Sequence, residues 1–219
     1  MLQTCWSGFL VDKFLDLGPN MDELRKLVPC LVKTWEAATA EDLVRAIECA
    51  IDSAAMQIND DRKDLQNISE DALTSHIRSH LNGMGFPATH DTGSGGHPDL
   101  VVKYGAHFQW VAEAKIYRGN EWLLQGFDQL YQRYISGIDG RRHGELIVFC
   151  YREKADEVLE NWIHRLREAR RSVAVEKGEA SAVWRSNHDS LAADGKVYIR
   201  HKGISIFFGK LKRDITSSC

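Results

Sequence analysis

An almost unbroken apolar segment, GELIVFCY at residues 144–151, limits the folds open to this chain. A run this short and this apolar is expected to form an interior β-strand that is covered on both faces. The flanking segments, residues 121–135 and 155–171, carry apolar residues at spacings of three and four, which is typical of amphipathic helices. The chain is therefore predicted to be an α/β protein with a central sheet flanked by helices.

A predicted strand hairpin holds the charged side chains of most interest. Strands are expected at residues 100–104 and 108–117, with Asp99 opening the first and with Glu113 and Lys115 two apart near the end of the second. Side chains alternate between the faces of a strand, so Glu113 and Lys115 share a face, and pairing of the strands brings Asp99 close to Glu113. Two carboxylates and an ammonium group at one end of a sheet are costly unless they bind a metal ion or do chemistry.

The segment before the hairpin is expected to be helical. A helical region is predicted for residues 1–60, with a break at Pro29 and a capping box at residues 39–42, and it would serve packing, partner binding or oligomerisation. Residues 61–219 would form the main domain and end in a β extension. The further predicted elements are a helix at 69–82 with Leu73, Ile77, Leu81 and Glu70 on one face, and strands at 182–185, 196–201 and 204–210 with a turn at 201–203.

Composition limits the class of protein. The 219 residues carry a formal net charge of −3, with 43% hydrophobic and 27% charged residues, which is ordinary for a soluble globular protein and argues against a highly basic nucleic-acid coat protein. The five cysteines form no CxxC pair, so reduced thiols in a cytosolic protein are expected. The N-terminal sequence lacks the features of a secretory signal and no stretch is long enough to span a membrane, so a cytoplasmic location is expected.

Two short motifs resemble a known family. HPD at residues 97–99, followed after thirteen intervening residues by EAK at residues 113–115, resembles the signature of the PD-(D/E)XK nuclease superfamily. The resemblance covers about residues 65–155. It implies a restriction endonuclease-like core, in which a small mixed sheet is flanked by helices, and a metal-dependent activity on phosphodiester bonds.

The resemblance also implies roles for the residues of the two motifs. Asp99 and Glu113, with the backbone carbonyl of Ala114, would bind Mg²⁺, for which Mn²⁺ can substitute, because Mg²⁺ prefers oxygen ligands and needs only one or two carboxylates. Lys115 would orient or help to deprotonate the attacking water. Its pKa would be lowered toward that role by the metal ion and by partial burial.

Residues on the neighbouring helices extend the resemblance. In such enzymes a helix before the motif often carries a glutamate, here Glu70, which would bind the metal through water or hold a second ion. A helix after the motif often carries a glutamine, here Gln125 or Gln129, and Gln125 would orient the water or contact the nucleic-acid backbone. The recombination-nuclease branch has a Gln-x-x-x-Tyr pattern, from which this chain departs because Tyr134 follows Gln129 one position late.

Each of these residues also has a purely structural alternative. Glu70 could complete a capping box with Asn67. Asp99 could be a turn residue. Glu113 and Lys115 could form an ion pair on a solvated edge strand, which would contribute little. The glutamines could line a solvated helix face.

Histidines and arginines elsewhere give weaker signals. His76 and His80 stand four apart on a helix without an HExxH motif, which favours a solvated pair over a zinc site. Several arginines after the motif could contact the phosphates of a nucleic acid or simply line an exposed helix face. These are Arg118, Arg133, Arg141 and Arg142.

These patterns lead to the hypothesis of a magnesium-dependent endonuclease that acts on DNA, with analogy pointing to bacterial DNA processing or phage defence. Because one such site cuts one strand, a homodimer or higher oligomer is expected, with the N-terminal helices as its candidate interface. Two alternatives stay open. One is a nuclease-like binding or assembly subunit with little or no cleavage, and the other is a hydrolase of RNA or of another phosphoester.

Overall fold

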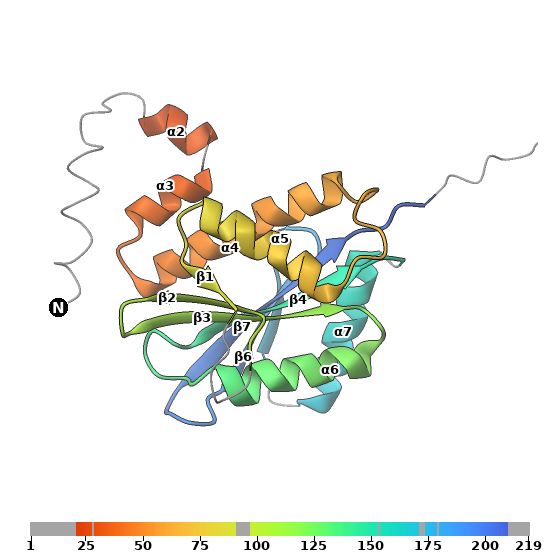
Figure 1. Cartoon of the computed structure of the whole chain (residues 1–219). Helices are drawn as coiled ribbons and strands as arrows, with labels where there is room; N and C mark the ends of the chain where they lie inside the picture. Colours follow the sequence, from red (N-terminus) through yellow and green to blue (C-terminus); the bar gives the residue numbers. More distant parts are fainter. Residues whose placement is uncertain are drawn as a thin grey trace, which may run out of the picture.

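A computed structural model describes residues 21–27, 29–90, 97–152, 154–170, 174–178 and 180–209 of the chain. In this part, one sheet of seven strands lies between helices (Figure 1). The strands are β1 (Ala88–Thr89), β2 (Leu100–Tyr104), β3 (Phe108–Ile116), β4 (His143–Cys150), β5 (Ala174–Lys177), β6 (Val183–Asp189) and β7 (Lys196–Ser205). The helices are α2 (Met21–Leu27), α3 (Pro29–Glu36), α4 (Ala40–Asp60), α5 (Glu70–Gly83), α6 (Asn120–Gln129), the π-helical turn η2 (Leu130–Tyr134) and α7 (Ala155–Ala169).

The sheet is mixed, with the strand order β1-β2-β3-β4-β7-β6-β5. β3, β4 and β7 run parallel at its centre, and the other neighbouring strands pair antiparallel. β4 is the middle strand, and its apolar residues from Leu146 to Cys150 are fully buried, as the sequence predicts. The prediction of an α/β protein with a central sheet flanked by helices is confirmed. The restriction endonuclease-like identity of the core stays a prediction.

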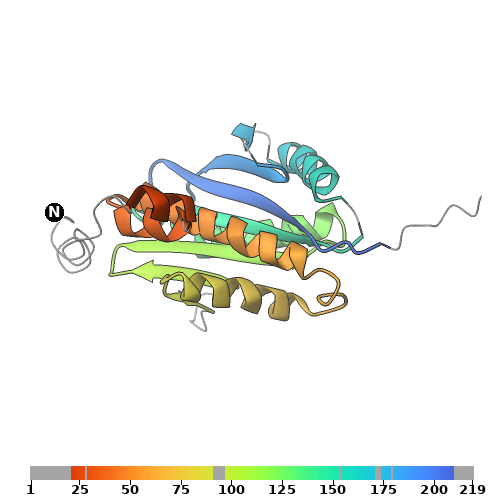
Figure 2. The same cartoon turned by 90° about the horizontal axis from the view of Figure 1, so that it is seen from above.

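Helices cover both faces of the sheet. α4 and α5 lie side by side on one face, and α6 and α7 lie on the other (Figures 1 and 2). Because side chains alternate along β4, Ile147 and Phe149 join the apolar cluster under α4 and α5, whereas Leu146 and Val148 join the cluster under α6 and α7. The two clusters make one three-layer arrangement around the sheet.

The helix starts follow the sequence signals. Pro29 begins α3 after the break that it was expected to cause. Thr39 caps α4, and its hydroxyl and backbone exchange hydrogen bonds with Asp42 in the predicted capping box. α4 shares its apolar cluster with the strands of the sheet. The division of the chain near residue 60 stays a prediction, and residues 1–20 of the proposed helical region lie outside the described residues.

The C-terminal strands differ from the prediction. β7 runs without a break from Lys196 to Ser205, so the expected turn at residues 201–203 is wrong. Gly203 is a regular strand position, and a Cβ added to it would lie 3.1 Å from the Cβ atoms of Ala155 and Ala182. The glycine therefore allows the start of α7 to pack closely on the sheet rather than making a turn. The sequence also did not predict the short edge strands β1 and β5.

Predictions from the cysteines and from the apolar segments have different outcomes. A disulfide joins Cys30 of α3 to Cys49 of α4, so the expectation of reduced thiols is wrong for this pair. α3 and α4 pack together and bring the two Cα atoms within 5.4 Å, although their spacing matches no motif. Cys5 and Cys219 lie outside the described residues.

None of the helices in the described ranges combines the length and the apolar character of a membrane span. The cytoplasmic location stays a prediction.

Candidate functional site

Asp99 and β3 form the centre of the candidate site. β2 and β3 pair antiparallel with Leu100 opposite Ala112, so Asp99, one residue before β2, lies beside the end of β3. The backbone N–H of Ala114 donates a hydrogen bond of 2.8 Å to Oδ2 of Asp99. Burial raises the pKa of Asp99, and the Ala114 hydrogen bond and the charge of Lys115 offset part of that rise. The side chain thus reaches across to the neighbouring strand, which a residue serving only a local turn would not do.

Glu113 is buried within the same cluster. Its side chain is 4% exposed, and its Oε1 lies 2.7 Å from Nζ of Lys115. Its Oε2 is buried and has no hydrogen-bond partner among the described residues. Burial, and then the charge of Asp99, raise the pKa of Glu113 to about 7. β3 lies between β2 and β4, so the alternative of an ion pair on a solvated edge strand is wrong.

Glu70 reaches this cluster from the start of α5. Its Oε2 accepts a 2.7 Å hydrogen bond from the backbone N–H of Ile116, and its Oε1 lies 3.3 Å from Nζ of Lys115. Ser69 caps α5 by accepting from the N–H of Ala72. The capping-box alternative for Glu70 is therefore wrong, because its carboxylate serves β3 and Lys115 rather than its own helix.

Lys115 is held between two carboxylates and the surface of α6. Gly126 of α6 lies so close that a Cβ added to it would be 3.0 Å from Cγ and 3.1 Å from Cε of Lys115. The indole ring of Trp122, one turn earlier, has its centroid 5.9 Å from Nζ. Burial acts to lower the pKa of Lys115, but its hydrogen bond to Glu113 and the three acids around it outweigh burial, so the pKa is raised. From the sequence, a metal ion together with partial burial was expected to lower this pKa, and burial without the ion does not lower it.

A π-helical turn changes the interpretation of the glutamine–tyrosine spacing. In η2 the N–H of Ile135 bonds to the carbonyl of Leu130, five residues earlier, at 3.1 Å. A π turn accommodates one more residue than an α turn, so Gln129 and Tyr134, at a spacing of five, lie about one turn apart on one side of the helix. Burial raises the pKa of Tyr134, and so do the charges of Glu113 and Asp99.

The other predicted site residues are placed as follows. Gln125 is exposed on α6, and within the described ranges none of the polar contacts of Asp99, Glu113 or Lys115 includes it. Ala114 supplies its N–H to Asp99, and its carbonyl as a metal ligand stays a prediction.

Two of the four arginines, Arg141 and Arg142, bind residues of neighbouring loops. Nη2 of Arg141 donates to the carbonyl of Ala106 at 2.8 Å, and Arg142 contacts Asp139 and the carbonyl of Asp194 at 3.1 Å each. Arg118 and Arg133 are exposed, and the guanidinium of Arg118 lies 5.3 Å from the ring centroid of Trp122. These two remain available for a phosphate backbone.

The histidine pair is not equally solvated. His76 is exposed, whereas His80 is half-buried with Nδ1 3.0 Å from Oε1 of Gln57 on α4, and burial lowers the pKa of His80. His80 therefore links α5 to α4. Over the described ranges, no three His, Cys, Asp or Glu side chains gather closely enough to hold a metal ion by themselves.

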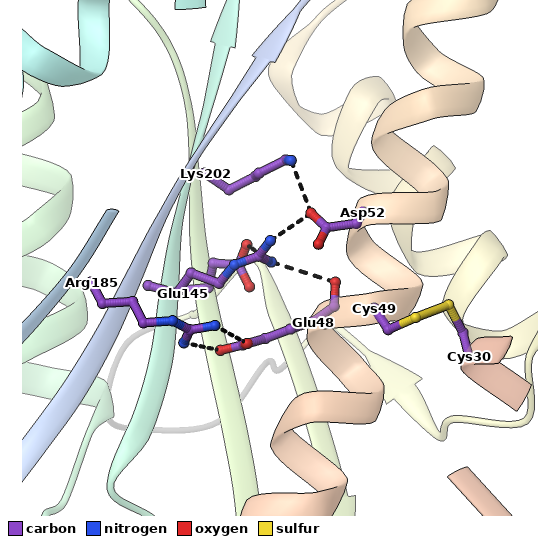
Figure 3. A network of polar contacts seen from close by, with 8 residues as sticks. Cys30, Glu48, Cys49, Asp52, Glu145, Arg185 and Lys202 are labelled. Carbon is purple, nitrogen blue, oxygen red and sulfur yellow. Dashed lines mark hydrogen bonds and ion pairs between the residues drawn. A yellow bond between two sulfur atoms is a disulfide. The ribbon is translucent and has the colours of Figure 1, made fainter. Parts of the chain in front are cut away.

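A second charged cluster, on the α4 face of the sheet, was not predicted from the sequence. Arg200 of β7 is 3% exposed and contacts Oε1 of Glu145 at 2.9 Å and Oδ1 of Asp52 at 2.5 Å. Figure 3 shows Glu48 and Asp52 of α4 reaching the basic side chains of the sheet. The carboxylate of Glu48 accepts hydrogen bonds from both terminal nitrogens of Arg185. One sequence signal could have indicated this cluster. Glu145 lies within the apolar segment 144–151, and an acid in a buried strand needs a partner.

Comparison with protein-family models, with curated protein sequences and with solved structures finds no match to this chain. The arrangement of its own residues is therefore the basis for assigning a function.

Proposed function

We propose that this chain is a magnesium-dependent nuclease that hydrolyses phosphodiester bonds of DNA. The observation that carries the proposal is the buried Oε2 of Glu113, which has no partner in the described ranges, beside Asp99 and Lys115. A buried carboxylate next to another acid lowers the stability of a fold, and a bound divalent cation would offset that cost. Hydrolysis of a phosphodiester builds negative charge on oxygen, which such a cluster with a cation is suited to stabilise.

The order of the elements supports a restriction endonuclease-like core. α5 precedes the β2–β3 hairpin, and α6 connects β3 to its parallel neighbour β4. The site residues come from the first residue of α5, the start of β2 and the last residues of β3, as the resemblance to the PD-(D/E)XK superfamily implies. The proposal thus rests on the agreement between this order and the position of the charged cluster.

The donor set fits a magnesium ion in type and number. Mg²⁺ takes oxygen ligands and keeps several waters, so one carboxylate oxygen each from Asp99 and Glu113, with the carbonyl of Ala114, would suffice. When bound, Mg²⁺ would neutralise charge on the scissile phosphate and acidify a water. Glu70 already holds Lys115 and the N–H of Ile116, so its role at the ion would be through water.

Lys115 would act on the attacking water and on the phosphate. Without a cation its pKa is raised, so the side chain is protonated and can donate hydrogen bonds to an anionic oxygen. A cation bound to Glu113 would compete for the carboxylate that now holds Nζ and would lower the pKa of Lys115 toward the range of a general base. Glu70 would keep Nζ in place during that change, because its contact to Lys115 is separate from the Glu113 contact.

DNA is the proposed substrate class, and Arg118 and Arg133 are the proposed contacts to its phosphates. Both are exposed on the side of the chain that carries α6 and η2. A homo-oligomer would allow both strands to be cut, with α2 and α3 as the proposed interface. A role in bacterial DNA processing or phage defence follows from analogy only.

The proposal is tested by incubating supercoiled and linear DNA with the protein in the presence of Mg²⁺, Mn²⁺ or a chelator. Wild type should nick DNA with either metal and not with the chelator. Asp99→Asn, Glu113→Gln and Lys115→Met should each lower the rate by at least about a hundredfold. The matched control Glu160→Gln, an exposed acid on α7, should cut like wild type. Equal nicking by wild type and all three site variants would overturn the assignment.

A binding or assembly subunit is the second candidate function. The observation that favours it is that Nζ of Lys115 lies 2.7 Å from Glu113 and 3.3 Å from Glu70, so that the charges of the cluster are already paired with one another. Salt-dependent binding of DNA without cleavage under any metal condition would support this candidate over a nuclease. Cleavage of RNA but not DNA in the same assay would change the substrate class and keep the site.

A further inference from the structure

A hollow of about 470 Å³ lies on the face of the sheet opposite to Asp99 and Glu113. It lies between the first half of α4 and the strands β5, β6 and β7, whereas Lys115 and Glu113 pack against α6 on the other face. A volume of this size is in the range of small-molecule sites. None of the proposed nuclease residues lines it, so it needs an explanation of its own.

The floor of the hollow is a row of four residues that face one another across four strands. Asn187 pairs with Ala174 on one side and with Tyr198 on the other, and Tyr198 pairs with His143. The rings of Tyr198 and His143 stack with their centroids 5.2 Å apart and an interplanar angle of 18°. Beyond Asn187 the row ends in the single methyl group of Ala174, which leaves space above the sheet beside Asn187.

Tyr198 is unusually accessible for a residue beneath a helical layer. It is 46% exposed, although it lies on a strand between β4 and β6. The side-chain amide of Asn187 borders the same hollow and makes no hydrogen bond within the described ranges. An aromatic surface and an uncommitted amide, which offers both a donor and an acceptor, thus lie next to each other.

The charges around the hollow disfavour an anionic occupant. Three glutamates and three arginines line it, so their formal charges cancel: Glu41, Glu48, Glu176, Arg45, Arg185 and Arg200. The terminal nitrogens of Arg185 are already bound to the carboxylate of Glu48 at 2.8 and 2.5 Å. Burial lowers the pKa of His143, so this ring is neutral near pH 7. A phosphate group would meet acids with no uncompensated cation to balance it.

We propose that this hollow binds a flat, uncharged nitrogen heterocycle of the nucleobase type, stacked on Tyr198 and hydrogen-bonded along its edge by Asn187. Stacking on an aromatic ring and reading of the edge by an amide are the usual means by which proteins recognise a base. The site is separate from the Asp99–Glu113 cluster and holds whether or not that cluster cleaves DNA.

Calorimetric titration of the full chain with adenosine, guanosine, cytidine and uridine tests this proposal, with the corresponding 5′-monophosphates as charged comparators. At least one nucleoside should bind saturably, and its monophosphate should bind no more tightly. Tyr198→Ala should weaken binding by about tenfold or more, and Asn187→Ala should weaken it and alter the preference among bases.

Two variants serve as controls. Phe208→Ala removes an aromatic ring of equal exposure, 46%, outside the hollow and should leave affinity unchanged. Glu113→Gln should also leave it unchanged. Absence of saturable binding by all four nucleosides at millimolar concentration would overturn the proposal. So would equal affinities of Tyr198→Ala and wild type, or a monophosphate that binds much more tightly than its nucleoside.

Discussion

Oε2 of Glu70 accepts a hydrogen bond of 2.7 Å from the backbone N–H of Ile116, so the first residue of α5 is tied to the last residue of β3. The other oxygen of the same carboxylate lies 3.3 Å from Nζ of Lys115. One side chain therefore fixes the end of the strand and the position of the lysine. This link joins the packing of α5 to the geometry of the candidate site.

Replacement of Glu70 should destabilise the fold as well as the site. Glu70→Ala leaves the N–H of Ile116 without its acceptor and should lower the free energy of unfolding by about 1.5–3 kcal/mol, as measured by urea denaturation. Glu70→Gln keeps a carbonyl acceptor and should cost less. Asp71→Ala, at the exposed next position of the same first turn, is the matched control. Equal losses for Glu70→Ala and Asp71→Ala would contradict the link to β3.

The buried acid Glu113 should make stability depend on pH. Its pKa of about 7 in the folded state lies above the ordinary 4.5, so the folded state binds the proton more tightly than the unfolded state does. The contribution is present at acidic pH, and the free energy of unfolding falls as the pH rises from about 4.5 to about 7.

Glu113→Gln removes this titration. The stability of the variant relative to wild type should therefore increase by about 1–3 kcal/mol between about pH 4.5 and about pH 8. Urea unfolding at a series of pH values measures the difference. Glu160→Gln, on the exposed face of α7, should show a flat difference over the same range. A flat difference for Glu113→Gln as well would show that the pKa of Glu113 is not raised in the folded state.

The small size of Gly126 should be required for α6 to pack against the side chain of Lys115. Gly126→Ala places a methyl group about 3 Å from Cγ of Lys115, a stem atom that cannot move without moving Nζ. The variant should lose about 1–3 kcal/mol of stability in thermal or urea unfolding, and nicking of DNA should fall with it. Gly83→Ala, where an added Cβ meets nothing within 4 Å, should be neutral or slightly stabilising. A neutral Gly126→Ala would show that α6 does not hold Lys115.

In the charged cluster under α4, loss of a buried arginine should cost more stability than loss of an exposed one. Arg200→Met leaves Glu145, which is 0% exposed, without its cation and should cost about 3–5 kcal/mol in urea unfolding. Arg185→Met breaks a pair whose arginine side chain is 44% exposed and should cost about 1 kcal/mol or less. Similar losses for the two variants would indicate that Glu145 is hydrated or protonated in the folded protein.

The sequence predicted most of the elements that position the site. The apolar spacing of Leu73, Ile77 and Leu81 identified α5, and all three are fully buried. The alternation around Glu113 identified β3. The charged hairpin could be found because its residues lie within one local segment, where the period of a strand fixes which side chains share a face.

Contacts between distant segments could not be predicted in the same way. The disulfide Cys30–Cys49 and the pair Glu145–Arg200 depend on how α3 packs on α4 and on β4 being the neighbour of β7, which no local pattern reports. Gly203 was interpreted as a turn residue because glycine serves both turns and close packing. The π turn at η2 shifts Tyr134 by one position, and no rule of α-helical spacing anticipates it.

Binding of Mn²⁺, measured by electron paramagnetic resonance of the free ion, tests most directly whether Asp99 and Glu113 form a metal centre. Titration of wild type should reveal one saturable site per chain, and Glu113→Gln and Asp99→Asn should each abolish it while Glu160→Gln retains it. Identical titration curves for wild type and Glu113→Gln would contradict the metal centre and the nuclease mechanism that depends on it.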